Sequence, residues 1–374
     1  MTTDLKHAEP FIRISKRGVP FPVWKAMSIR ALALLAALVL CAVIIFAIVK
    51  LNPLKVYVAM FEGAFGTNKR MWVTIRDMMM LLCIALGLAP AFKMRFWNIG
   101  AEGQILLGGI ASAFCMIHLS GYLSTLPMML LMFVLSIVAG GIWGLIPGVF
   151  KAKWGTNETL FTLMMNYIAI QLTAYFVALW ENPIGSNTVG VSNARTKIGW
   201  FPELFGQAYA LNVILVLVLT VLMFIYLRYS KQGYEIAVVG ESLNTARYAA
   251  MNVPKVIMRT TFISGAVCGI AGFLAVSGAS HTISTSTAGG RGFTAIIVAW
   301  LAKFNPFAMI LISALLIFLD KGAIEIASRY NLNNHVSNML MGIILFFVMG
   351  SEFFIDYQVK FRSGKQKEVQ ACRN

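Results

Sequence analysis

Long runs of residues without charge constrain this chain more than any other feature. Residues 31–49 contain no Asp, Glu, Lys or Arg, and the run is long enough to cross a bilayer as one helix. Further apolar runs follow along the chain, and 59% of its residues are hydrophobic against 12% charged. A helix satisfies its backbone hydrogen bonds within one segment, as hydrocarbon requires. The sequence therefore predicts an all-α polytopic membrane protein.

About ten apolar stretches are predicted to be transmembrane helices. They are 31–49, 73–92, 104–118, 127–150, 157–172, 211–227, 261–279, 294–302, 307–319 and 335–350. The stretch at 294–302 is too short to cross a bilayer unaided, so a broken or re-entrant helix is expected there. Residues 1–30 form a polar leader, 31–350 the transmembrane domain and 351–374 a basic tail. The longest charged loop between spans is predicted at 228–259.

The distribution of Lys and Arg predicts the orientation of these spans. With the N-terminus inside, 21 of the 31 Lys and Arg residues fall in inside segments and the other 10 in outside segments or at the outer end of the span 73–92. Short loops rich in Lys and Arg stay on the cytosolic side. Both termini and the loop at 228–259 are therefore predicted to be cytosolic.

The remaining composition argues against several classes of protein. The net charge is +16, but the basic residues are dispersed between apolar runs, so nucleic acid is not an expected partner. The five cysteines include no CxxC pair, and the four histidines are scattered. No HExxH, Ser-His-Asp or Walker A pattern occurs. We expect no enzyme activity, no metal site and no cofactor on this chain, so any ATP would be bound by another one.

A polar segment interrupts the apolar pattern between the second and third predicted spans. Glu102 lies there between Gly100 and Gly103, with Asn98 and Gln104 on either side. A carboxylate near bilayer depth is costly and usually faces a water-filled cavity, a partner side chain or the cytosol. An ordinary short loop and a functional element are both compatible with this segment.

The stretch NIGAEGQ, at residues 98–104, resembles the permease subunits of ATP-driven importers for nucleosides and simple sugars, relatives of the ribose-type permeases. Two further stretches resemble the same family, NETLFTLMMNY from Asn157 and GGRGFTAIIVAWLAKFNPF from Gly289. The resemblance implies a permease that works with three partners: a cytosolic ABC ATPase, a second homologous permease and an extracytoplasmic binding protein or lipoprotein. It also implies a multi-pass protein of the bacterial inner membrane, surrounded by membrane lipid.

Polar groups in these stretches are candidates for the substrate pathway. They are Asn98, Glu102, Gln104, Asn166 and Arg291. Gly290 and Gly292 bracket Arg291 much as two glycines bracket Glu102, and ten spans allow two five-helix halves of opposite topology. The two charged elements then fall at corresponding places in an inverted repeat. It is equally open that Glu102 and Arg291 are structural charges near opposite membrane interfaces.

The loop at 228–259 contains a short predicted surface helix with Glu241-Ser242 at its start. It resembles the coupling helix on which the ATPase subunit of these importers docks. The residues that match are Gly240, Glu241, Asn244, Ala246, Ala249 and Ala250. Ala250 stands where the family more often has glycine. Without the resemblance, a solvated loop would be the simpler interpretation.

The function predicted from these observations is the permease subunit of an ABC importer that translocates a nucleoside or a related small polar solute. A simple-sugar permease is the alternative, and an ion-coupled secondary transporter is a further class. An ABC importer and a secondary transporter differ in one requirement, because only the importer needs an ATPase partner.

Overall fold

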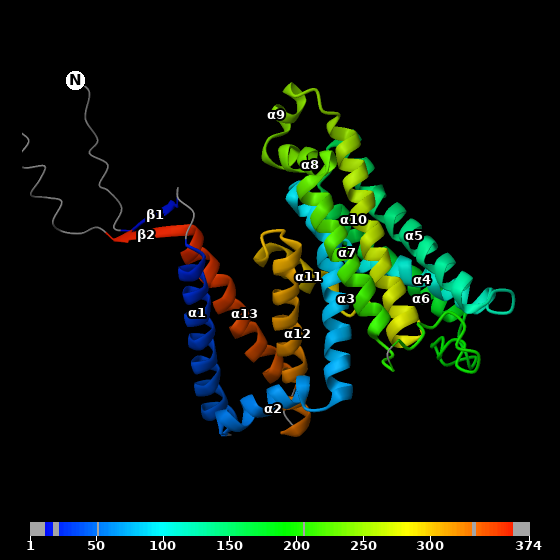
Figure 1. Ribbon diagram of the computed structural model, residues 1–374, viewed down its shortest axis with the longest axis horizontal. Helices are drawn as coiled ribbons and strands as arrows, with labels where there is room; N and C mark the ends of the chain where they lie inside the picture. The colour runs from blue at the N-terminus through cyan, green and yellow to red at the C-terminus, as the bar shows by residue number, and fades with distance from the viewer. Residues whose placement is uncertain (1–11, 18–21, 51, 205, 331–333, 362–374) are drawn as a thin grey trace, which may run out of the picture. The chain divides into compact units, whose positions relative to one another are not determined.

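The computed structural model describes residues 12–17, 22–50, 52–204, 206–330 and 334–361 (Figure 1). Its described part is helical, with thirteen α-helices and two short strands. It divides into two compact units, one of residues 1–63 with 320–374 and one of residues 64–319. Helices α2 (Pro53–Phe65) and α12 (Pro306–Arg329) each run from one unit into the other.

The smaller unit joins the two ends of the chain. Helix α1 (Val23–Ile44), which continues in a π-helical turn at Ile45–Val49, packs against α13 (Asn334–Asp356). Strands β1 (Ile12–Lys16) and β2 (Tyr357–Phe361) pair antiparallel.

The sequence alone did not predict these strands. It indicated a polar leader over residues 1–30 and a basic tail over residues 351–374. Apolar residues alternate with polar ones in both strands, the period of a β-strand. The two segments come from opposite ends of the chain, so neither shows its partner locally. The rest of the leader up to residue 11 and the tail from 362 lie outside the described residues.

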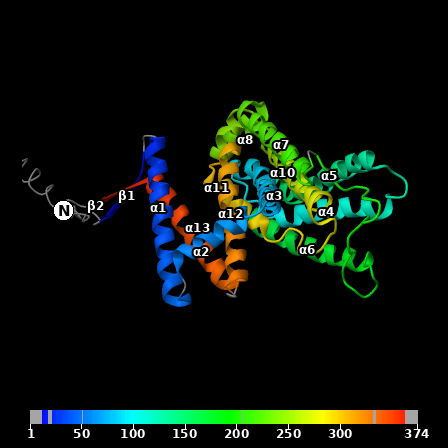
Figure 2. The same ribbon diagram turned by 60° about the horizontal axis from the view of Figure 1, so that its bottom comes forward.

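The larger unit contains the helices that surround the predicted functional segments. They are α3 (Asn68–Lys93), α4 (Ala101–His118), α5 (Thr125–Trp154), α6 (Glu158–Leu179), α7 (Ala210–Tyr229), α8 (Lys231–Glu241), α9 (Leu243–Tyr248), α10 (Val253–Ala275, continued by the π-helical turn Val276–Ser280) and α11 (Arg291–Leu301). Helix α10 packs against α3, α4 and α5 (Figure 1, Figure 2). In the apolar stretches of α3 and α10, 83% and 78% of the residues are buried, so these two helices form the centre of the unit.

Close approach of α5 and α10 depends on glycines spaced four residues apart. A Cβ atom on Gly140 would lie 2.5 Å from the Gly265 carbonyl oxygen, and one on Gly144 would lie 2.7 Å from that of Thr261. Contacts this short are incompatible with any side chain on this face of α5. The small-residue face therefore serves helix packing.

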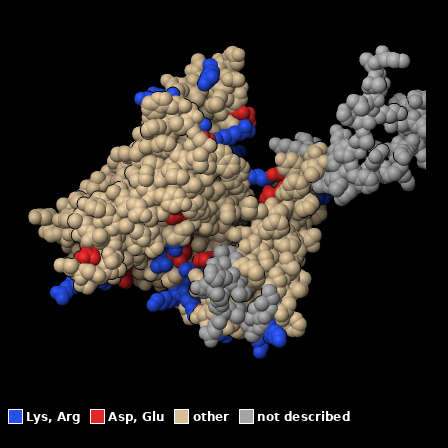
Figure 3. All heavy atoms as spheres, turned by 180° about the vertical axis from the view of Figure 1, so that it is seen from behind, with Lys and Arg blue, Asp and Glu red and all other residues tan. Residues whose placement is uncertain are grey.

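Seven helices of the described chain are long and apolar enough to cross a membrane. Helices α4, α11 and α13, which correspond to three of the ten expected spans, are not among them. Helix α11 has 11 residues, in agreement with the short helix expected at 294–302. On the face seen in Figure 3, a broad area of the larger unit is free of Lys and Arg, and the Lys and Arg side chains visible there gather at its margins. The fold is thus that of a multi-pass membrane protein.

Candidate functional site

The NIGAEGQ segment covers the end of the turn between α3 and α4 and the first turn of α4. Helix α3 ends at Lys93, and α4 begins at Ala101 after the cap residue Gly100. Within the turn, Asn98 and Gln104 exchange two amide hydrogen bonds of 3.2 and 3.3 Å. The Asn98 side chain also donates to Ser264 Oγ of α10 at 3.0 Å and accepts from the Gly100 amide at 3.0 Å. Both amide side chains are buried and hold the turn against the centre of the unit.

Helix α6 binds the same turn from another side. Asn166 accepts from the Gly103 amide at 2.9 Å and donates to the Ile99 carbonyl at 2.8 Å. One turn earlier, Thr162 Oγ1 accepts from the Ile99 amide at 3.2 Å. Glu158, Thr162 and Asn166 are spaced four residues apart and share one face of α6, and this face is directed at the NIGAEGQ segment. Glu158 of the same face instead pairs with Lys151 of α5 at 2.7 Å.

Gly103 lies where α4 passes close to α5 and α6. A Cβ atom there would lie 2.9 Å from Trp143 Nε1 and 3.1 Å from both Ala169 Cβ and Asn166 Oδ1. The glycine thus permits the close approach that the Asn166 hydrogen bond needs.

Glu102 connects this turn to α11. Its Oε1 atom accepts a hydrogen bond from the Gly292 amide at 2.7 Å, and the residue is only 7% exposed. Gly290, at φ +75°, is the cap residue of α11, and Gly292 lies in its first turn. The first amides of a helix lack intrahelical acceptors and carry partial positive charge, which favours a carboxylate at this position.

Arg291 binds a second carboxylate rather than Glu102. Its guanidinium lies 3.3 Å from Asp77 Oδ1 of α3, and Arg76 lies 2.9 Å from the same oxygen. Asp77 is 2% exposed. Arg76 also donates to the Tyr209 hydroxyl at 3.4 Å. A chain of polar contacts therefore runs from the start of α11 to the loop that precedes α7.

The structure brings the predicted pathway residues to one place. Asn98, Glu102, Gln104 and Asn166, together with Gly292, form a polar junction that joins the α3–α4 turn to α6 and α11; Arg291 lies next to it. Most polar atoms of the junction are hydrogen-bonded to other protein groups. A structural role in holding the helix ends together is therefore enough to explain why these polar side chains are buried here. Their role in a substrate pathway stays a prediction. Sequence reasoning missed Asp77, although an adjacent Arg and Asp inside the predicted span 73–92 were a signal.

The predicted coupling segment is folded as two short helices, α8 and α9. Ser242 accepts from the Thr245 amide at 3.2 Å, as expected of a cap at this position. At the other end of the segment, the Asn252 side chain caps the start of α10 by accepting a hydrogen bond from the Lys255 amide at 3.1 Å. Ala250 has φ +54°, a conformation that favours glycine. The glycine that the resemblance places at this position would adopt this conformation without strain.

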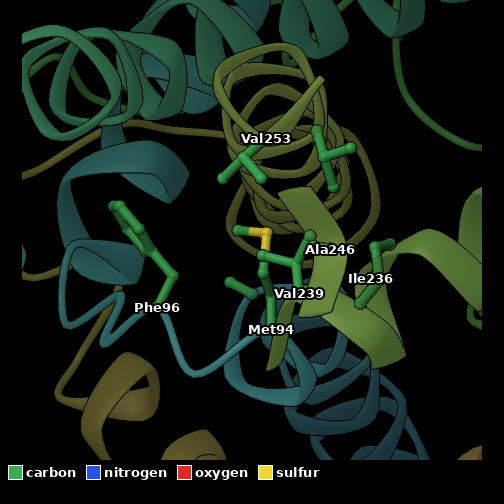
Figure 4. Close-up of a cluster of buried hydrophobic side chains, with 8 residues drawn as sticks. Met94, Phe96, Ile236, Val239, Ala246 and Val253 are labelled. Carbon is green, nitrogen blue, oxygen red and sulfur yellow. The ribbon is translucent and has the colours of Figure 1, made fainter. Parts of the chain in front are cut away.

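The six matched residues of this segment face in two directions. Gly240 and Ala246 are buried, whereas Glu241, Asn244, Ala249 and Ala250 are exposed. A Cβ atom on Gly240 would collide with the Lys93 carbonyl at the end of α3. Ala246 belongs to a cluster of buried hydrophobic side chains with Ala91, Met94, Phe96, Ile236, Val239, Val253 and Val256 (Figure 4). The cluster packs α8 and α9 directly onto the residues that lead into the NIGAEGQ turn.

A cavity of about 270 Å³ lies beside this contact. Its walls come from α8, the α8–α9 junction, the α3–α4 turn and parts of α5, α6 and α10, and they carry Arg95, Lys151, Glu158 and Glu241. Charged side chains of both signs around a small cavity at a surface suit protein contact better than an apolar solute. In the described part of the chain, no three His, Cys, Asp or Glu residues converge as a metal site would require.

Residues 70–349 match the family described as branched-chain amino acid transport system / permease component. The guanosine ABC transporter permease protein NupP of Bacillus subtilis is 31% identical over 320 residues, which cover 84% of this chain and 89% of NupP. The glucose ABC transporter permease protein TsgB13 of Haloferax volcanii is 26% identical over 90% of this chain and 91% of its own length. A second guanosine permease protein of Bacillus subtilis, NupQ, is 24% identical over 60% of this chain and 72% of NupQ. No solved structure shows a significant match.

Proposed function

The chain belongs to the branched-chain amino acid transport system / permease component family, and from that premise we propose that it is the subunit through which an ABC importer translocates a nucleoside. As a member of this family it is a non-catalytic transmembrane subunit. The observation that carries the finer proposal is its 31% identity to a guanosine permease over most of both chains.

A simple sugar is the second candidate, because a glucose permease is also similar over nearly the whole chain. The substrates are chemically related, since a nucleoside contains a pentose whose hydroxyls need the same hydrogen-bonding partners as a sugar. A nucleoside additionally presents a flat base, which aromatic side chains bind by stacking. A site with accessible aromatic faces would therefore favour the nucleoside.

The order of elements supports two halves of opposite topology. Each half has a first helix, a short surface segment, a buried central helix, an irregular turn and then three helices. The first half runs from α1 to α6, and the second from α7 to α13. Glu102 and Arg291 then stand in the first turns of corresponding helices, α4 and α11. This correspondence, with the charge distribution along the chain, supports ten spans and cytosolic termini in a bacterial inner membrane.

The packing of α8 and α9 supports a route for energy transfer from an ATPase. The exposed residues Asn244 and Ala249 are available to a partner, while Gly240 and Ala246 join the segment to the end of α3. A displacement of α9 would therefore be transmitted as a rigid-body motion to the NIGAEGQ turn, and from Glu102 to α11. ATP is hydrolysed on the partner in this proposal.

An ABC permease also requires partners for substrate delivery and for a closed pathway. We expect an extracytoplasmic binding protein or lipoprotein and a second homologous permease. Two guanosine permease proteins from one organism, NupP and NupQ, both resemble this chain, which supports a pair of related permeases. A purified active complex with a single copy of this chain and no other permease would contradict the pairing.

Reconstitution tests the function directly. The complete complex is incorporated into vesicles, and uptake of radiolabelled guanosine is compared with uptake of glucose in the presence and absence of ATP. The proposal predicts ATP-dependent uptake of guanosine that unlabelled nucleosides compete away and glucose does not. Accumulation by this chain alone on an ion gradient would instead identify a secondary transporter.

A further inference from the structure

A cavity of about 380 Å³ lies at the end of α10 opposite to α8 and α9. It is formed by the loop before α7, the π-helical turn at Val276–Ser280 and the start of α5. If α8 and α9 face the cytosol, this cavity opens on the extracytoplasmic side. Its volume is in the range of small-molecule sites.

The aromatic wall of the cavity is fixed by contacts that precede any ligand. The rings of Trp200 and His281 stack at 3.7 Å with an angle of 7° between their planes. Trp200 Nε1 donates to the Ser192 carbonyl at 2.9 Å, and the Ser192 amide donates to the His281 carbonyl at 2.9 Å. Phe201 is anchored to α10, because its amide donates to the Ser277 carbonyl at 3.1 Å. A wall built in this way loses little conformational entropy on binding.

One polar atom on the same wall has no hydrogen-bond partner among the described residues. It is Ser277 Oγ, on a residue that is fully buried. Buried hydroxyls and ring nitrogens in folded proteins nearly always have partners, so each exception needs a reason. A ligand hydroxyl group beside Ser277 would supply the missing hydrogen bond.

The charges around the cavity select against an ionic ligand. One basic side chain, Lys197, and one acidic side chain, Glu203, line it together with Tyr209. This balance gives neither a cluster of Arg and Lys for a phosphate nor a cluster of carboxylates for a cation. Aromatic faces together with an unpartnered hydroxyl suit a neutral molecule that has a flat ring and hydroxyls.

From these observations we propose that the cavity is a binding site for a nucleoside before it enters the membrane pathway. This inference rests on the proposed nucleoside function and adds a site to it. The base would lie against the wall of Trp200, and a pentose hydroxyl would bond to Ser277. The site is also linked to the polar junction, because Tyr209 contacts Arg76, which pairs with Asp77.

Equilibrium binding of radiolabelled guanosine to the purified complete permease–ATPase complex tests the site. Trp200→Ala is expected to weaken binding roughly tenfold through lost stacking. Ser277→Ala is expected to weaken it by a smaller factor of about threefold to tenfold through a lost hydrogen bond. Trp154→Ala is the matched control, because Trp154 is an exposed tryptophan at the far end of α5 and should leave binding unchanged.

Basal ATPase activity and elution volume are measured to verify that each variant complex is folded. Wild-type guanosine binding by folded Trp200→Ala and Ser277→Ala complexes would overturn the site, and unaltered guanosine uptake by wild type would leave the proposed function intact. Loss of binding-protein docking in Trp200→Ala without loss of guanosine binding would also overturn it, in favour of a protein contact. A wild-type complex that transports glucose and not guanosine would refute the nucleoside function itself.

Discussion

The carboxylate of Glu102 accepts a hydrogen bond from the Gly292 amide at 2.7 Å, although the two residues are 190 positions apart in the chain. Each residue lies in the first turn of a helix that follows an irregular segment. The contact couples the start of α4 to the start of α11. Changing it is therefore expected to alter how the two helices move during transport.

Glu102 variants separate a hydrogen-bonding role from a charge role. Glu102→Gln keeps an oxygen that can accept from Gly292, so much of the transport should remain. Glu102→Ala leaves the amide without this acceptor, at about 1 to 3 kcal/mol, and should retain little transport. The measurement is ATP-driven uptake in vesicles. If both variants transport at the original rate, and a cysteine introduced in place of Glu102 stays inaccessible to aqueous thiol reagents during turnover, the segment is only a packing element.

Gly292→Ala should weaken the same contact from the other side. The added Cβ would lie 2.9 Å from the Glu102 amide nitrogen and 3.0 Å from its Oε1, so the helix ends must separate. We expect a destabilisation of about 1 to 3 kcal/mol, seen as a lower unfolding temperature in detergent. Gly121→Ala is the control, because nothing lies within 4 Å of a Cβ there. Equal unfolding temperatures for both variants would contradict the close contact.

Asp77→Asn should disturb the start of α11 through Arg291. The substitution removes the negative charge that Arg76 and Arg291 share, at 2.9 and 3.3 Å, in a site where Asp77 is 2% exposed. Both arginines are partly exposed, so we expect a loss of about 1 to 3 kcal/mol, below that of a fully buried pair. The measurement is thermal unfolding of the purified protein. Asp77→Glu, which keeps the charge, should lose less, and an equal loss would point to shape rather than charge.

Ala249→Glu tests the docking of an ATPase on α9. Ala249 is exposed at the end of the helix, so a bulky acid there should leave the permease in the membrane and abolish both uptake and permease-dependent ATP hydrolysis. The assay is co-purification of the ATPase followed by uptake. Ala194→Glu, on an exposed loop residue outside the coupling segment, is the control and should assemble normally. Normal assembly and uptake by Ala249→Glu would refute the docking surface.

Ala250→Gly should stabilise the protein. Ala250 has φ +54°, where a Cβ costs roughly 1 to 2 kcal/mol, while the extra freedom of glycine in the unfolded chain offsets about 0.4 to 1 kcal/mol. The net gain should be about 0.5 to 1 kcal/mol and should raise the unfolding temperature. Ala249→Gly, whose φ of −78° needs no glycine, should lower it. A lower unfolding temperature for Ala250→Gly would show that the residue is not strained in solution.

Local patterns predicted most of the helices because the bilayer imposes length and polarity on each one separately. They also located the α6 face of Thr162 and Asn166, and the cap at Ser242, since both depend on spacing within a single helix. The pairing of β1 with β2 and the length of α12 were missed. Strand pairing between opposite ends of the chain has no local signal, and charged residues near a span end do not mark where its helix stops.

The sequence by itself determined that this chain is a helical membrane protein of a permease type, because hydrophobic runs and the NIGAEGQ segment are local features. Only the tertiary structure decided how the polar groups are used. In the folded structure Glu102 accepts a hydrogen bond from Gly292, Arg291 pairs with Asp77 and not with Glu102, and Gly240 packs against the Lys93 carbonyl. The physical reason is that a buried charge takes the partner that packing brings nearest, and packing depends on helices that are distant in the chain.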